Sequence, residues 1–381
     1  MNYNDQVLLK KIKTPAYVID ERLLIKNLEL LKDIQNQTGA KILLALKGFS
    51  MFYEFDLIGK YLYGITSSSL NEALLGRKHM NKEVHIYAPA FNLDEIEMIA
   101  KTCDHMVFNS AEQIRKFRAL AKKYNPKLEF ALRVNPEYSE VETEIYNPCA
   151  VNSRLGAKKE TFSKQDLIGL DGLHFHTMCE QNSDTLERTL EVIEEKFGEY
   201  LYQMKWINMG GGHHITRKDY DVKKLIRMIN HIKNKYKVEV YLEPGEAIVL
   251  NCGYLVSSVL DIVENNMNLL LLDTSAACHM PDVIEMPYKP SIIGADKMDE
   301  GEYKYRLGGV SCLAGDIIGD YSFDHPIKVG EKLIFEDMAH YTMVKNNTFN
   351  GINLPAIAII NEVGVKIIKK FGFADYESRL S

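Results

Sequence analysis

The chain has 381 residues, of which 46% are hydrophobic and 26% charged, the balance of a folded globular protein. Its formal net charge of −6 argues against non-specific binding to nucleic acid and weakly favours a cationic small molecule as ligand. Because one hydrophobic core rarely extends over this length, we expect two domains.

Six cysteines are scattered along the chain without a paired CxxC spacing, so we expect neither disulfides nor a structural zinc site. The N-terminal residues lack a basic segment followed by an apolar core, and no apolar run reaches membrane-spanning length. The sequence therefore predicts a cytoplasmic protein with neither a membrane nor nucleic acid as partner.

In chain order, a short strand at 15–19 precedes a helix at 21–35, after which strands and amphipathic helices alternate. Eight strands alternating with helices predict an α/β fold, the parallel (β/α)8 barrel, over 21–247. The expected strands are 41–46, 62–66, 83–87, 105–108, 128–134, 172–176, 205–209 and 238–243. The expected helices between them include 68–77, 93–101, 111–124, 184–197 and 222–236.

The polar segment 135–160 has no helical period and is longer than an ordinary barrel loop, which is typical of a functional loop. Beyond residue 247 the period changes to alternation, which predicts a second, mostly antiparallel β domain formed by 1–20 and 248–381. Its expected strands are 254–263, 268–273, 302–307, 332–336, 340–345, 356–360 and 363–369.

Residues suited to chemistry follow the ends of several barrel strands, where active sites of this fold lie. They are Lys47, Arg133, His174, His176, the glycines 210–212 and Glu243. A barrel without a catalytic function would not be expected to gather these residue types at one end. We therefore place the candidate site there.

Lys47 follows an apolar strand, and a lysine beside apolar walls has a lowered pKa and becomes nucleophilic toward an aldehyde cofactor. The alternative is a solvated lysine at a strand end. Three consecutive glycines leave backbone N–H groups free to approach a phosphate, although a tight turn is the simpler explanation of such a run.

Glu243 is suited to hold a pyridine nitrogen protonated, which makes the ring an electron sink; the alternative is an exposed carboxylate. His176 offers a flat ring for stacking, or it is a hydrogen-bonded core histidine. A metal site built from the histidines and Glu243 would leave Lys47 and the glycines unexplained, so we expect no catalytic metal.

Short segments of the chain resemble, in the same order, motifs of the alanine-racemase-fold pyridoxal phosphate decarboxylases, also called fold type III. The segments are 45–47, 132–135, 172–176, 208–212, 243–245, 311–316, 340–342 and 348–351. Within that family, 172–180 and 279–288 are most similar to the decarboxylases of carboxynorspermidine and carboxyspermidine.

The resemblance implies a role for each matching residue and a homodimer with shared active sites. Lys47 would bind pyridoxal phosphate covalently, His176 would stack on its ring, and Glu243 would contact its nitrogen. The phosphate would be held by Gly211, Gly212, Gly245 and Tyr341, with Arg133 near the ring. Cys312 of the second subunit would reprotonate the carbanion that remains after carbon dioxide leaves.

The resemblance also implies a carboxylated polyamine as substrate, decarboxylated to norspermidine or spermidine in polyamine biosynthesis. Glu246 stands where many relatives have arginine, which adds negative charge where an amine could bind. Asp273, Asp282, Asp316 and, less strongly, Glu285 would extend that acidic surface, unless they are ordinary solvated loop residues. A related decarboxylase of ornithine, arginine or diaminopimelate is the nearest alternative, and a binding protein without activity is disfavoured.

Overall fold

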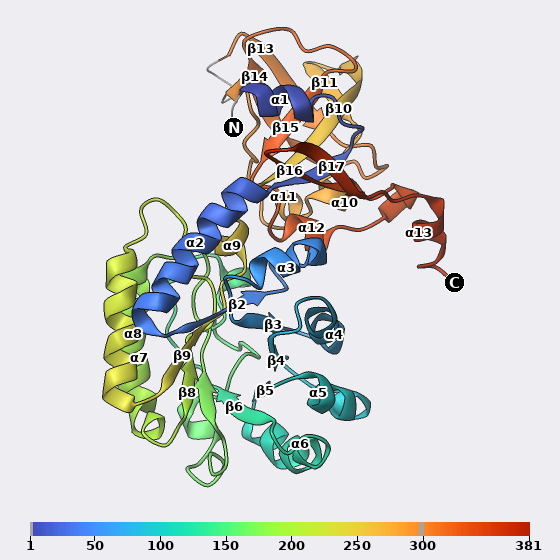
Figure 1. The fold of residues 1–381 in the computed structure, drawn as a ribbon. Helices are drawn as coiled ribbons and strands as arrows, with labels where there is room; N and C mark the ends of the chain where they lie inside the picture. Colours follow the sequence, from blue (N-terminus) through green and yellow to red (C-terminus); the bar gives the residue numbers. More distant parts are fainter. Residues whose placement is uncertain (1–2, 297–300) are drawn as a thin grey trace. The chain divides into compact units, whose positions relative to one another are not determined.

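The computed structural model describes residues 3–296 and 301–381 (Figure 1). Its contacts divide the chain into a barrel unit, Asn27–Ile248, and a sheet unit formed by Met1–Lys26 and Val249–Ser381. The domain limits expected from the sequence, 21–247 for the barrel and 1–20 with 248–381 for the β domain, stay a prediction. Among the described residues, no helix combines the length and hydropathy needed to cross a bilayer.

In the described part of the barrel unit, eight parallel strands close on themselves, because β9 pairs with β2. This confirms the predicted (β/α)8 barrel. The strands are β2 (Lys41–Ala45), β3 (Gly64–Ser67), β4 (Glu83–Tyr87), β5 (His105–Phe108), β6 (Glu129–Arg133), β7 (Gly172–His174), β8 (Trp206–Asn208) and β9 (Glu239–Leu242).

Helices surround the strands on the outside of the barrel (Figure 1). Several begin at side-chain caps: Ser69, Ser110 and Asp221 each accept a hydrogen bond from a backbone N–H three residues later. The helices are α2 (Glu21–Thr38), α3 (Phe55–Ile58), α4 (Leu70–His79), α5 (Ile96–Thr102), α6 (Ala111–Tyr124), α7 (Ser183–Leu201), α8 (Val222–Tyr236) and α9 (Glu246–Val249).

The long connection between β6 and β7, which the structure describes in full, contains no α-helix and only short 3₁₀ turns, Glu144–Tyr146 and Lys159–Thr161. A parallel bridge between Val134 and Ala157 ties part of it to the end of β6. This loop therefore lies at the carboxyl end of the barrel strands.

Side chains of alternate strand residues fill the barrel interior. Leu43, Val107, Ala131, Trp206 and Tyr241 form one buried cluster there. Gly172 makes room for the indole, because a Cβ at this position would lie 2.3 Å from Trp206 Cδ2.

The sheet unit is built around one mixed, mostly antiparallel sheet with the order β12-β14-β13-β11-β10-β1-β16-β17, and β15 also pairs with β10. This confirms the predicted β domain. Its strands are β1 (Ala16–Asp20), β10 (Gly253–Glu264), β11 (Asn268–Leu272), β12 (Ala295–Asp296), β13 (Tyr303–Gly308), β14 (Ile317–Phe323), β15 (Lys332–Glu336), β16 (Ala356–Asn361) and β17 (Gly364–Lys369). Its short helices are α1 (Tyr3–Leu9), α10 (Ala276–His279), α11 (Asp282–Glu285), α12 (Thr342–Lys345) and α13 (Phe373–Glu377).

Two predictions for the sheet unit were wrong. The segment 340–345 is not a strand, because Thr342–Lys345 forms α12 and Lys345 makes ion pairs with Asp282 and Glu285 of α11. The sequence analysis also missed β14, whose Gly319 and Asp320 are typical turn residues. In the sheet, Asp320 instead accepts a 2.7 Å hydrogen bond from Arg306 of β13.

We expect Gly172→Ala to lower the free energy of unfolding by about 1–3 kcal/mol, because the added methyl group overpacks the barrel against Trp206. Gly372→Ala is the matched control, since a Cβ there meets no atom within 4 Å. Urea unfolding of both variants provides the measurement. Equal midpoints for the two variants would contradict this account of Gly172.

Candidate active site

Lys47 lies just beyond β2 at the carboxyl end of the barrel. Its side chain reaches solvent, but protein surrounds it on several sides. Desolvation first, and then the positive charge of Arg133, lower the pKa of Lys47 below its usual value. A larger fraction of this lysine is therefore the neutral, nucleophilic amine near neutral pH than of an ordinary lysine.

Glu243 follows β9 and is buried, with 7% of its surface exposed. Asn208 Nδ2 donates a 2.7 Å hydrogen bond to Oε1, and His174 Nε2 lies 3.3 Å from Oε2. Burial alone would raise the pKa of Glu243, but its interactions with His174 outweigh burial and bring the pKa to about 2. The carboxylate is therefore ionised throughout the neutral range.

The three glycines after β8 form a loop that tolerates no side chain. A Cβ at Gly210, Gly211 or Gly212 would lie 2.4, 2.4 or 2.0 Å from a backbone carbonyl oxygen. Gly210 and Gly212 also have φ values of 70° and 81°, which favour glycine. Only glycine therefore fits at these positions, and the Gly210 and Gly211 N–H groups already donate to Asn208 Oδ1 and His176 Nδ1 rather than being free for a phosphate.

His176 is oriented by this loop, because the Gly211 N–H donates a 2.9 Å hydrogen bond to His176 Nδ1. Burial first, and then the charge of Lys47, lower the pKa of His176 well below its usual value, so the ring is neutral. Arg133 Nη2 donates to the His176 carbonyl oxygen at 3.1 Å, and its guanidinium lies 4.6 Å from the centre of the Tyr87 ring.

Gly245 lies against the strand that leads to Lys47, since a Cβ at Gly245 would be 3.2 Å from the Ala45 carbonyl oxygen. The next residue, Glu246, points a carboxylate oxygen to within 3.1 Å of His214 Nε2. Glu180, after β7, completes a group whose oxygen and nitrogen atoms all lie within 4.8 Å of one another. The loops after β7, β8 and β9 therefore carry a locally acidic surface.

The structure brings several of the predicted residues together at one end of the barrel unit, and their roles stay predictions. They are Lys47, Arg133, His176, Gly211, Gly212, Glu243 and Gly245. The sequence analysis missed Asn208, which both holds Glu243 and accepts a 2.9 Å hydrogen bond from the Gly210 N–H. The only signal for Asn208 was its position, a polar residue that ends a buried strand two residues before Gly210.

In the sheet unit, Cys312 is exposed, and its N–H donates a 2.8 Å hydrogen bond to Asn350 Oδ1. Asp316 is buried under the same loop, where its carboxylate accepts hydrogen bonds from Ser311 N, Ala277 N and Ser275 Oγ at 3.1, 3.2 and 2.8 Å. Asp316 thus fixes the loop that presents Cys312.

The other predicted residues of the sheet unit also have local partners. Asp273 accepts hydrogen bonds from the side chains of Thr14 and Ser257, and Asp282 pairs with Lys345. Tyr341 precedes α12 with a φ of 49°, a strained conformation for a residue other than glycine. Substrate or phosphate contacts of these residues stay predictions.

The residues at the barrel end fit pyridoxal phosphate. A lysine with a lowered pKa suits the aldehyde, a loop that only glycine can form permits close approach of a phosphate, and an ionised buried carboxylate suits a protonated pyridine nitrogen. These three features follow from the lowered pKa of Lys47, the lowered pKa of Glu243 and the clashes that any side chain would cause at the glycines.

Residues 16–339 match the family model of pyridoxal-dependent decarboxylases, described as the C-terminal sheet domain. The chain therefore belongs to the pyridoxal-dependent decarboxylase family. The resemblance seen in the sequence is confirmed, and the protein is a carboxy-lyase that uses pyridoxal phosphate.

Individual relatives cover nearly the whole chain. A carboxynorspermidine/carboxyspermidine decarboxylase of Campylobacter jejuni is 46% identical over 97% of this chain and 99% of its own. A carboxyaminopropylagmatine decarboxylase of Synechocystis is 42% identical over 100% of this chain and 98% of its own. The crystal structure of carboxynorspermidine decarboxylase from C. jejuni, complexed with norspermidine, is 45% identical with a TM-score of 0.90, covering 97% of this chain and 100% of its own.

When bound, pyridoxal phosphate supplies a ring that accepts the electron pair left behind by carbon dioxide. The chain's own residues prepare the place for it. Lys47 offers an amine with a lowered pKa, Glu243 stabilises positive charge, and the Gly211 N–H orients the His176 ring, which burial keeps neutral.

We expect Lys47→Ala to abolish covalent attachment of pyridoxal phosphate, because no other lysine combines this position with a lowered pKa in the described residues. Borohydride reduction followed by peptide mass spectrometry locates the attachment site. Lys60→Ala, at an exposed position, is the control and should keep the adduct. A reduced adduct on Lys41 or Lys60 of the unmodified protein would overturn the assignment.

Proposed function

We propose that the protein decarboxylates carboxynorspermidine and carboxyspermidine to norspermidine and spermidine, as a step of polyamine biosynthesis. The observation that carries this proposal is the 46% identity, over nearly the full length of both chains, with a decarboxylase named for these two substrates. The bound norspermidine in the related crystal structure supports the same substrate class.

The charge distribution at the barrel end supports a cationic substrate. Glu246 and Glu180 bring two carboxylates close to His214. A second carboxylate on a substrate, as in diaminopimelate, would be repelled there, whereas an ammonium group would be attracted. We propose that Glu246 binds a substrate amine, and we propose Asp273, Asp282 and Asp316 as further substrate-binding residues.

Carboxyaminopropylagmatine is a second candidate substrate, because a decarboxylase named for it is 42% identical to the whole chain. This molecule ends in a guanidinium group, whereas carboxynorspermidine and carboxyspermidine end in a primary amine. The same acidic residues suit both ends, since a carboxylate pairs with either cation. Ornithine, arginine and diaminopimelate rank below these extended substrates.

We further propose that the protein is a cytoplasmic homodimer in which Cys312 of one subunit completes the site around Lys47 of the other. Support comes from the family resemblance of 311–316 and from the exposed position of Cys312 on a fixed loop. Cys312 would deliver the proton that replaces carbon dioxide, and Tyr341 would contact the phosphate.

We expect carboxynorspermidine and carboxyspermidine to have specificity constants far above those of diaminopimelate, ornithine and lysine. Glu246→Gln should raise the KM for the polyamine substrates by about tenfold, equivalent to about 1.4 kcal/mol, with a smaller change in kcat. Steady-state kinetics on the full substrate panel, including carboxyaminopropylagmatine, gives both constants. Glu112→Gln, at an exposed site on α6, is the control. A higher specificity constant for ornithine or diaminopimelate would refute the polyamine assignment.

We expect a mixture of inactive Lys47→Ala and Cys312→Ala proteins to regain activity. Random exchange of subunits makes half of the dimers mixed, and each mixed dimer has one of its two sites intact, so recovery should approach about one quarter of the unmodified activity. Activity after mixing is the measurement, with native mass spectrometry to confirm subunit exchange. Exchange without recovery would contradict a shared site.

A further inference from the structure

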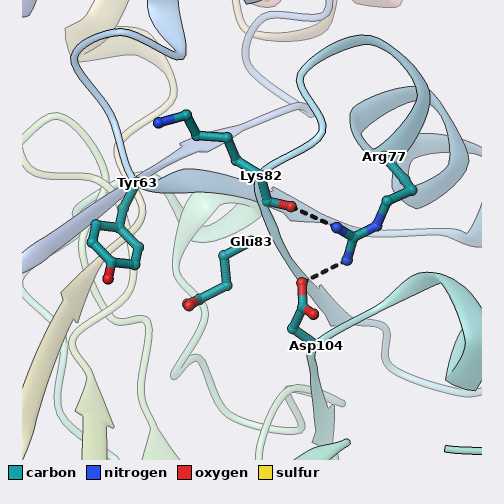
Figure 2. Close-up of a pocket in the computed structure, with 5 residues that line it drawn as sticks. All are labelled: Tyr63, Arg77, Lys82, Glu83 and Asp104. Atoms are coloured by element: carbon teal, nitrogen blue, oxygen red, sulfur yellow. Dashed lines mark hydrogen bonds and ion pairs between the residues drawn. The ribbon is translucent and has the colours of Figure 1, made fainter.

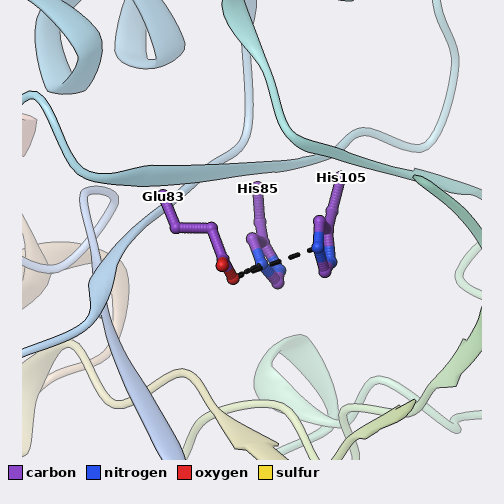
Figure 3. A group of neighbouring side chains, drawn as sticks. All are labelled: Glu83, His85 and His105. Atoms are coloured by element: carbon purple, nitrogen blue, oxygen red, sulfur yellow. Dashed lines mark hydrogen bonds and ion pairs between the residues drawn. The ribbon is translucent and has the colours of Figure 1, made fainter. Parts of the chain in front are cut away.

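Tyr87 is the last residue of β4, and the side chains before it on the same face of the strand are well packed. Residues 83, 85 and 87 alternate along β4, so they share one face. Figure 3 shows Glu83 and His85 extending from β4 toward His105 of β5. His85 Nε2 lies 2.8 Å from Glu83 Oε1, and the two imidazole rings stack with their centres 4.0 Å apart.

The amino end of β4 is also fixed by hydrogen bonds. The pocket that opens there is lined by Tyr63, Arg77, Lys82, Glu83 and Asp104 (Figure 2). Asp104, just before β5, accepts hydrogen bonds from the Val84 N–H at 2.8 Å and from Arg77 Nη2 at 2.6 Å. These contacts join the start of β4 to the start of β5, so the barrel itself sets the position of Tyr87 at the other end of the strand.

The Tyr87 ring contacts both the barrel core and the candidate active site. It packs against the buried cluster in the barrel interior. The Arg133 guanidinium lies 4.6 Å from the ring centre, within the range of a cation–π interaction, and the His174 ring centre lies 5.6 Å away. Arg133 acts on the charge of Lys47, and His174 acts on that of Glu243. Tyr87 therefore touches a neighbour of each charged group of the site.

The Tyr87 hydroxyl is held by Asn109, which follows β5. It donates a 2.7 Å hydrogen bond to Asn109 Oδ1. The same Oδ1 accepts from the Gly156 N–H at 2.6 Å, and Asn109 Nδ2 donates to the Arg154 carbonyl oxygen at 2.8 Å. Because a backbone N–H only donates and a carbonyl only accepts, these two bonds fix the orientation of the amide.

Arg154 and Gly156 belong to the long loop between β6 and β7, at the point where it returns to the barrel. The next residue, Ala157, forms the bridge to the end of β6. Gly156 has a φ of 82°, which favours glycine in this tight return. The side chain of Asn109 thus joins the returning segment 154–157 to Tyr87, and through Tyr87 to the candidate active site.

We propose that Asn109 and Tyr87 are positioning residues, which hold the Arg133 guanidinium in place while the returning segment of the loop is seated. The proposal rests on the proposed place of Arg133 near the cofactor ring. Arg133 Nη2 also donates to the His176 carbonyl oxygen at 3.1 Å, so its position affects the ring expected to stack on the cofactor. When segment 154–157 leaves, Asn109 loses both of its loop partners and the Tyr87 hydroxyl loses a fixed acceptor. Retention of pyridoxal phosphate therefore depends on the loop.

The test measures how tightly the full-length, loaded enzyme retains pyridoxal phosphate, by equilibrium dialysis and the absorbance of the bound cofactor. Tyr87→Phe keeps the ring and removes the hydroxyl, whereas Asn109→Ala removes all three side-chain hydrogen bonds. We expect each variant to raise the dissociation constant by about two- to tenfold, the range of one neutral hydrogen bond. The double variant should retain the cofactor as well as Asn109→Ala does, because both changes break the same link.

Hydrogen exchange of the backbone amides separates this link from the anchoring of the loop. Asn109→Ala should speed exchange at the Gly156 N–H, because it removes the acceptor of that group. Tyr87→Phe should leave this exchange unchanged and still weaken cofactor retention. A change that only loosened the fold would move both measurements together.

Asn125→Ala is the matched control at the amino end of β6. Its amide also binds backbone groups on both sides, donating to the Ala100 carbonyl oxygen at 2.9 Å and accepting from the Lys127 N–H at 3.0 Å. This variant should retain the cofactor like the unmodified protein. Equal weakening in Asn125→Ala would overturn the proposal.

The proposal is also overturned if Tyr87→Phe and Asn109→Ala retain the cofactor as tightly as the unmodified protein, or if their effects add in the double variant. Arg133→Met tests the placement on which the proposal rests, and unchanged retention there would refute both. None of these measurements uses a substrate, so an error in the substrate assignment would appear only in the kinetic tests and leave these results unchanged.

Discussion

An ionised carboxylate enclosed by the barrel is the constraint on which the catalytic end depends. Removing the Glu243 carboxylate from water costs several kcal/mol unless its oxygens have partners. Asn208 and His174 supply them, and the same Asn208 side chain accepts a hydrogen bond from Gly210. The Asn208 side chain therefore links the Glu243 carboxylate, which is expected to contact the pyridine nitrogen, to the glycine loop, which is expected to hold the phosphate.

The barrel could be predicted because its strands and helices have clear and different periods, and because parallel strands place their carboxyl ends together. The positions of Lys47, Glu243 and the glycines at this end could be predicted as well, since each begins within two residues of the end of a strand. Asn208 could not, because its partner is 35 residues away and only the pairing of β8 with β9 makes them neighbours. In the sheet unit, 340–345 alternates like a strand, yet local ion pairs and the backbone of Tyr341 give a helix.

The acidic residues illustrate a further limit of sequence reading. A carboxylate is visible in a sequence, but its partners are not. Asp316, read as part of an acidic surface, is buried and accepts hydrogen bonds from the loop that carries Cys312. Asp273 likewise holds Thr14 and Ser257 within the sheet unit. Glu246, by contrast, lies beside His214 at the barrel end, where charge can act on a bound molecule.

The chain contains a single tryptophan, and it lies inside the barrel. Trp206 is 1% exposed, stacks on His105 with ring centres 4.8 Å apart, and donates its indole N–H to Glu129. Tryptophan emission from this protein therefore reports on the barrel unit alone, and the sheet unit is silent in that signal. Circular dichroism detects both units, so a denaturation curve that differs between the two methods would reveal whether the units unfold together.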